Sequence, residues 1–105
     1  MGTRAVDIKN TEHLKDLLQG APVRVEQAFL FGSRATGHAL EWSDWDILMV
    51  SPDFAGVPFP DRASVLLRAL PLKRAELFCY TPDEFRQGLD EIGLISEAVK
   101  GTRLI

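Results

Sequence analysis

Apolar residues along this chain follow helical spacing in some stretches and form short, strand-like runs in others. After Asn10, a favourable N-cap, leucines at positions i, i+3 and i+4 predict an amphipathic helix that Gly20 stops. The segment 23–31 is rich in β-forming residues and predicts a largely buried strand that ends at Gly32. Residues 32–35 then predict a turn or a short helix.

The same alternation continues in the middle of the chain. An apolar run predicts a second strand over 45–50. The glycine- and proline-containing stretch 54–60 is expected to be a loop, and the spacing of apolar residues from Ala63 to Leu70 predicts a helix after it. A third strand is expected at about 74–80. The chain therefore alternates helices with strands up to this point.

The last quarter of the chain predicts helices. Thr81 is an N-cap followed by proline and a capping-box glutamate, and apolar residues recur at helical spacing as far as Ile92. Gly93 breaks this helix, and residues 94–99 suggest one or two further turns before a short end. The order of elements predicts an α/β (α+β) fold, with helices on one or both faces of a small sheet. No G-x-G-x-x-G follows the first strand, which argues against a dinucleotide-binding domain.

Composition and charge narrow the class of protein. With 105 residues, 46% of them hydrophobic, the chain is expected to form a single domain over 1–105. Its net charge of −3 argues against binding nucleic acid through bulk positive charge. Cys79 is the single cysteine, so no internal disulfide can form, and no apolar run reaches the length of a membrane span. We expect a cytoplasmic protein that does not associate with membranes.

Two acidic residues begin the predicted strand over 45–50. Asp44 and Asp46 are two positions apart, and because side chains alternate along a strand, both carboxylates project from the same face. Two neighbouring carboxylates repel each other unless a cation joins them. Mg²⁺ prefers oxygen ligands and is often held by one or two carboxylates together with substrate phosphates. This pair therefore suggests a site for Mg²⁺ and a nucleotide.

A second feature, Gly32-Ser33, stands where the first buried strand ends and a helix is expected to begin. Backbone N–H groups at such a place can bind an anion, and glycine lets a phosphate approach the main chain closely. Ser33 as a simple helix cap is compatible with this interpretation. Arg34 is a further candidate for phosphate contact, with a solvated or salt-bridged arginine as the alternative. Together these residues predict a grip on a triphosphate.

The combined pattern resembles the minimal nucleotidyltransferases (MNT proteins) of the DNA polymerase beta superfamily. Gly32-Ser33, ten intervening residues and Asp44-Trp45-Asp46 match the signature of that family, and Ser43 stands at its usual place before the first aspartate. The resemblance implies the nucleotidyltransferase fold, with a small mixed sheet flanked by helices. It also implies two Mg²⁺ ions held by Asp44 and Asp46, ATP as substrate, and phosphate contacts from Gly32, Ser33, Arg34 and Ser43.

The family supplies a third carboxylate from a neighbouring strand, and Glu76 is the best candidate here. Relatives often have aspartate at that position, and glutamate is longer by about one carbon. By the resemblance, Glu76 is a third metal ligand or helps to activate the acceptor hydroxyl; the alternative is an exposed residue of an edge strand.

The implied activity is transfer of a nucleoside monophosphate, AMP from ATP, to a hydroxyl group with release of pyrophosphate. The resemblance further implies a helical HEPN protein as partner, modified on a tyrosine and thereby neutralised in a toxin–antitoxin pair. The alternative is an inactive module that neutralises its partner by binding alone, and a small-molecule nucleotidyltransferase acting as a homodimer is a third hypothesis. Apolar residues near the end either form such an interface or pack on the domain's own sheet: Leu94, Ile95, Leu104 and Ile105.

Three other residues have a simpler interpretation. Trp42 and Trp45 flank the acidic pair and are candidates for stacking on a base, but Trp45 falls on the opposite strand face and is expected to be core. Cys79 is expected to be a small buried hydrophobic residue, because no basic neighbour lowers the pKa of its thiol.

Overall fold

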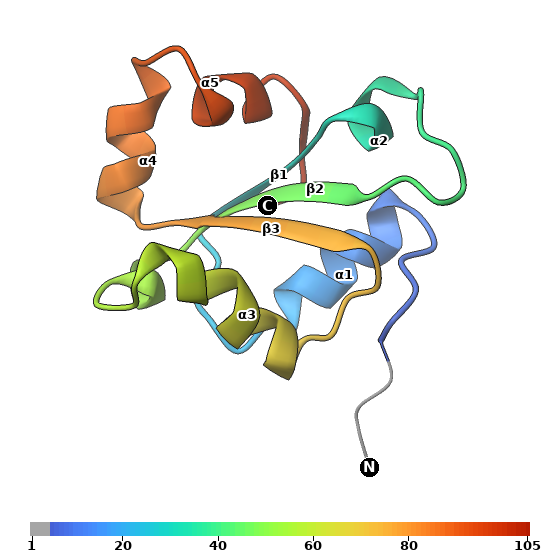
Figure 1. The fold of residues 1–105 in the computed structure, drawn as a ribbon, viewed down its shortest axis with the longest axis horizontal. Helices are drawn as coiled ribbons and strands as arrows, with labels where there is room; N and C mark the ends of the chain where they lie inside the picture. The colour runs from blue at the N-terminus through green and yellow to red at the C-terminus, as the bar shows by residue number, and fades with distance from the viewer. Residues whose placement is uncertain (1–4) are drawn as a thin grey trace.

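A four-stranded mixed sheet organises residues 5–105, the part of the chain that the computed structural model describes (Figure 1). The predicted domain over 1–105 also includes residues 1–4, which lie outside the described part. The elements in chain order are α1 (Thr11–Gln19), β1 (Gln27–Phe31), α2 (Ser33–Thr36), β2 (Trp45–Val50), a 3₁₀ turn (Pro52–Phe54), α3 (Phe59–Ala69), β3 (Ala75–Tyr80), α4 (Pro82–Leu89), α5 (Leu94–Ala98) and β4 (Thr102–Arg103).

The strands lie in the order β3-β2-β1-β4. Strand β1 is antiparallel to both β2 and β4, whereas β2 and β3 run parallel. Helix α3 crosses between β2 and β3, as a parallel connection requires. This crossover brings the first residues of β2 and β3 to the same end of the sheet.

Helices cover both faces of the sheet (Figure 1). The alternation along β2 separates two buried clusters: Ile47 packs with residues of α1 and α3, whereas Leu48 packs with Phe85 of α4 and Ile95 of α5. Trp45 belongs to the first cluster and is only 7% exposed, which confirms the prediction that it is core. The predicted fold class, a small mixed sheet flanked by helices, is also confirmed.

The ends of two predicted elements were wrong. The first strand begins at Gln27, because its partner β2 ends at Val50, which pairs with Gln27 and leaves residues 23–26 without a neighbouring strand. Helix α3 begins at Phe59, inside the predicted loop. Pro60 lies in its first turn, where backbone N–H groups have no partner within the helix, so proline, which has no N–H, is tolerated there.

The C-terminal quarter also differs from the prediction. Helix α4 ends at Leu89, so Ile92 is not part of it and is fully exposed. Thr102 and Arg103 form β4, which pairs with β1. A two-residue polar strand has no detectable apolar alternation, and only its pairing with β1 defines it.

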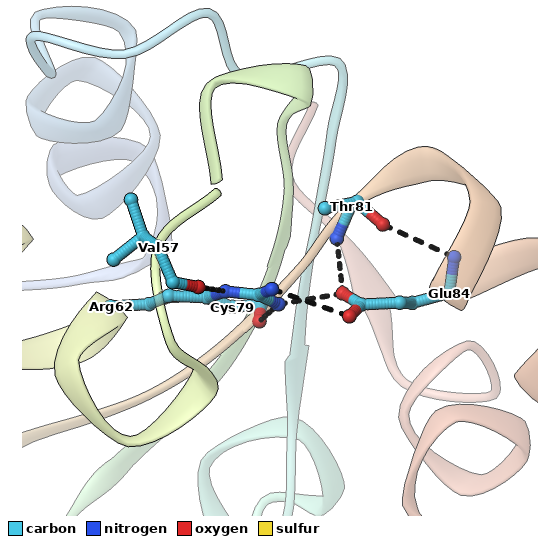
Figure 2. Close-up of polar contacts among 5 residues, drawn as sticks. All are labelled: Val57, Arg62, Cys79, Thr81 and Glu84. Atoms are coloured by element: carbon cyan, nitrogen blue, oxygen red, sulfur yellow. Dashed lines mark hydrogen bonds and ion pairs between the residues drawn. The ribbon is translucent and has the colours of Figure 1, made fainter. Parts of the chain in front are cut away.

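A buried arginine joins α3 to the beginning of α4 (Figure 2). Arg62 is 7% exposed and donates to Glu84 through Nη1, at 2.6 Å from Oε1. It also donates to the carbonyl oxygens of Val57, at 2.9 Å, and Cys79, at 3.1 Å. Glu84 in turn accepts from the backbone N–H of Thr81 at 2.8 Å, which completes the predicted capping box. One guanidinium therefore connects two helices and the end of β3.

Glu84→Gln is expected to destabilise the protein at neutral pH and to have little effect in acid. The hydrogen bond from Arg62 lowers the pKa of Glu84 below its usual 4.5. The stabilisation is therefore complete above pH 4.5 and is lost as the pH falls through the lowered folded-state pKa. We expect a loss of about 1 kcal/mol at pH 7, modest because the side chain is 41% exposed. Urea unfolding of both proteins from pH 7 to pH 3 tests this, and a difference that does not vary with pH would contradict it.

Candidate functional site

Three carboxylates lie at the beginning of the parallel strands β2 and β3. Asp46 and Glu76 are the second residues of their strands, and the register pairs them directly. Asp44 precedes β2 by one residue, and its charge acts on Asp46. The structure thus brings together the three acidic residues that the sequence singled out.

The carboxylates lie at the opposite end of β2 and β3 from the end that α4 follows. Asp46 alternates with Leu48 and therefore projects from the face on which α4 and α5 pack. Helix α4 follows the far end of β3 (Figure 1), whereas Asp46 stands at the beginning of β2 and Glu76 at the beginning of β3. Asp46 is half-buried, and both Asp44 and Glu76 are exposed. A ligand can therefore reach them from solvent.

The carboxylates disturb one another electrostatically. Burial raises the pKa of Asp46 above its usual 3.8, and the negative charges of Glu76 and Asp44 raise it further. These causes all oppose ionisation of Asp46, and a cation bound nearby would oppose them. The site is thus one in which positive charge is favourable.

The carboxylates do not form a ready-made metal cage. Within residues 5–105, no three His, Cys, Asp or Glu side chains are arranged closely enough to hold a metal ion among themselves. The donor chemistry nevertheless suits Mg²⁺, which prefers oxygen ligands and commonly takes only one or two from carboxylates. Substrate phosphates and water would complete the shell.

Gly32 lies directly against Asp46. Its φ of 74° is in the region that favours glycine, and a Cβ at this position would overlap Oδ2 of Asp46. Ser33 follows as the first residue of the four-residue helix α2. The backbone at Gly32 therefore comes so close to the carboxylate of Asp46 that only glycine fits there.

Arg34 and Ser43, both expected to contact phosphate, are engaged with the loop before β2. Arg34 donates to the carbonyl of Ser43 through Nη2 at 2.8 Å and Nε at 3.2 Å, and to the carbonyl of Glu41 at 3.1 Å. The hydroxyl of Ser43 accepts from the N–H of Leu40 at 2.9 Å. Their predicted contact with phosphate stays a prediction.

Cavities of about 310 to 370 Å³ open at several places on this protein, and the one of 370 Å³ opens beside Gly32. It lies between α2 and the end of α5. Its lining residues are Phe31, Gly32, Ala35, Thr36, Glu97, Lys100 and Gly101. The sequence did not indicate Lys100, because it lies 68 positions after Gly32 in the chain and belongs to no motif.

The structure shows the surroundings of Cys79 and Trp42. Cys79 is buried, as predicted, and burial raises the pKa of its thiol to about 12 against the opposing charge of Arg62, which disfavours the reactive thiolate. Trp42 is 63% exposed in the loop before Asp44. It remains a candidate for contact with a ligand.

A mixed sheet with a Gly-Ser turn against an acidic pair defines this protein as a nucleotidyltransferase-type domain. The family model described as "Nucleotidyltransferase domain" matches residues 11–102. The chain therefore belongs to the nucleotidyltransferase domain family, and the general activity of that family is nucleotidyl transfer.

A solved structure agrees with the family assignment. The chain resembles a protein from Sulfolobus solfataricus described as a candidate nucleotidyltransferase, with 26% identity and a TM-score of 0.51. The match covers 73% of this chain and 68% of that one. A comparison with curated proteins found no match.

In residues 5–105, no helix is both long enough and apolar enough to cross a bilayer.

Proposed function

We propose that this protein transfers AMP from ATP to a hydroxyl group in a Mg²⁺-dependent reaction that releases pyrophosphate. The observation that supports this most is the contact between the Gly32 turn and Asp46, with Asp44 and Glu76 beside it. A phosphate-binding turn and an acidic pair at one place are what nucleotidyl transfer needs. ATP, rather than another nucleotide, is taken from the resemblance to MNT proteins.

Each residue has a role in this proposal. Gly32 and Ser33 bind the triphosphate, and Asp44 and Asp46 hold Mg²⁺, which neutralises charge on the phosphates. The acceptor oxygen bonds to the α-phosphorus of ATP as the bond to the bridging oxygen breaks, and pyrophosphate leaves. Glu76, in register with Asp46, accepts the proton of the acceptor hydroxyl or serves as a third ligand.

We infer from the family resemblance that the acceptor is a tyrosine of a helical HEPN partner, which the modification neutralises. Two of the apolar residues considered for an interface, Ile95 and Leu104, are buried in the domain itself. This favours packing on its own sheet as their role. An interface with the partner would then have to use other surfaces.

One observation favours the alternative of an inactive module that neutralises its partner by contact. The three carboxylates are not arranged as a metal cage within residues 5–105. If Glu76 takes no part in the site, metal affinity is weak and turnover is absent. Binding of the partner would then survive substitution of Asp44 or Asp46.

Calorimetric titration of Mg²⁺·ATP into the chain and into Asp44→Asn, with and without EDTA, tests the proposal without knowledge of the acceptor. We expect binding that requires the metal and is lost in the variant. Absence of binding by the unaltered chain would contradict the proposed site and favour the inactive module. Intact mass of a candidate partner after incubation with ATP then shows whether one AMP is added to it.

A further inference from the structure

The loop between α2 and β2, residues 37–44, is held by two arginines, one from α2 directly before it and one from the entry to β3. Three consecutive carbonyl groups in this loop, those of Glu41, Trp42 and Ser43, accept hydrogen bonds from arginine side chains. Asp44 comes directly after them. The loop therefore has an unusual degree of side-chain support at the point where it carries a carboxylate of the site.

Arg34 supports the loop from α2. Its guanidinium bonds to two of the carbonyls, and it lies over the ring of Trp45, with 4.3 Å between Cζ and the ring centroid. Because Trp45 is buried, its ring holds the stacked guanidinium on one face, in addition to the hydrogen bonds that the guanidinium donates. Arg34, the residue after Ser33, thus contacts both neighbours of Asp44: the carbonyl of Ser43 and the ring of Trp45.

Arg74 supports the loop from the other side, at the entry to β3. Its Nη1 donates to the carbonyl of Trp42 at 2.8 Å, and its own carbonyl accepts from the N–H of Trp45, also at 2.8 Å. Arg74 has a φ of 59°, a conformation that is unfavourable for a residue with a side chain. Such a conformation persists only where the surrounding contacts hold it.

We propose that Arg34 and Arg74 are positioning residues that fix loop 37–44, and through it Asp44, relative to Asp46 and Glu76. Arg34 is next to Ser33 in the chain, and Arg74 is two residues before Glu76. The two side chains therefore tie the loop to both other segments that carry the site. This inference rests on the proposed function, because it assigns Asp44 a part in that site.

The competing role for Arg34 is direct contact with a phosphate through its positive charge. Lysine keeps that charge, but it cannot reproduce a planar guanidinium that serves two carbonyls and stacks on an indole. A phosphate contact is thus rescued in part by Arg34→Lys, whereas a positioning role is not. The same substitution at Arg68, an exposed arginine of α3 far along the chain from the loop, is the matched control.

The first measurement is amide hydrogen exchange of residues 38–44 without nucleotide. In Arg34→Lys, Arg34→Ala and Arg74→Lys, we expect exchange of the hydrogen-bonded amides of Leu40 and Ser43 to accelerate at least about tenfold, because the arginine bonds that hold the loop carbonyls are lost. Exchange in α4, and everywhere in Arg68→Lys, is expected to be unchanged. Normal exchange of the loop in the Arg34 and Arg74 variants would overturn the proposal, whether or not the protein transfers nucleotide.

The second measurement separates kcat from KM for nucleotide transfer. A misplaced Asp44 disturbs both metal binding and the chemical step, so kcat falls and KM for Mg²⁺·ATP rises, and Arg34→Lys is then as impaired as Arg34→Ala. A raised KM with unchanged kcat, restored by lysine, would assign Arg34 to phosphate binding and overturn the proposal. If the unaltered chain transfers nothing, the proposed function fails, and the exchange experiment decides by itself whether the arginines hold the loop.

Discussion

Asp46→Asn is expected to abolish nucleotide transfer, with a loss of more than about 100-fold. Even substitution of a residue that only supports a metal ligand lowers metal affinity or activity by up to about that amount. Asparagine has nearly the shape of aspartate but lacks the negative charge that Mg²⁺ requires. Asp46 also lies in the centre of the site, in register with Glu76 and against the Gly32 turn. Among residues 5–105, no other carboxylate has both Glu76 and Gly32 as such neighbours.

The same substitution is expected to stabilise the protein in the absence of ligand. The pKa of Asp46 is raised by burial and by Glu76 and Asp44, so ionisation of this residue weakens the fold as the pH rises above 3.8. Asparagine removes that repulsion, and Tm at pH 7 should therefore rise.

Steady-state assays and thermal unfolding of Asp46→Asn test both effects together. Asp16→Asn, at an exposed position of α1, is the control and should change neither activity nor Tm. Retained transfer in Asp46→Asn would remove Asp46 from the site. A fall in Tm together with lost activity would mean that the variant is damaged in its fold rather than in its chemistry.

Arg62→Ala is expected to destabilise the protein by about 3 kcal/mol. The change leaves the carbonyls of Val57 and Cys79 without this donor and Glu84 without its cationic partner (Figure 2). The estimate is at the lower end for a broken buried pair, because the side chain of Glu84 is 41% exposed.

This loss corresponds to a fall in Tm of roughly 15 °C for a domain of this size. Thermal and urea unfolding of Arg62→Ala measure it, with Arg68→Ala, an exposed position on the same helix, as the control. Equal stability of the two variants would show that the connection between α3 and α4 contributes nothing. Because Arg62 does not belong to the carboxylate site, any activity that remains at low temperature should be unchanged per folded molecule.

Much of the fold was predictable because it depends on local patterns. Strand β2 has the predicted bounds 45–50, since every residue of its apolar run is buried or half-buried in the sheet. The capping box at Thr81 begins α4 as expected, because its hydrogen bonds join residues three positions apart. Strand β4 was missed, as its two polar residues are a strand only through pairing with β1.

The candidate site was predictable in its acidic residues but not in its support. Asp44 and Asp46 were recognisable from their spacing to Gly32-Ser33, and Glu76 from alternation together with the family resemblance. Nothing in the sequence indicated that Arg74 reaches a carbonyl 32 positions away. Arg34 was interpreted by its charge, whereas its surroundings engage it with the loop.

The sequence by itself determined the order of helices and strands as far as α5, the separation of Trp45 from the acidic residues, and the family, because these follow from spacing along one segment. Only the tertiary structure decided the pairing of Asp46 with Glu76, the fit of Gly32 against Asp46, and the two arginines on one loop. Each of these depends on strand register and on contacts between distant segments. Such contacts form only in the folded chain, where the crossover between β2 and β3 and the loop 37–44 bring these segments together.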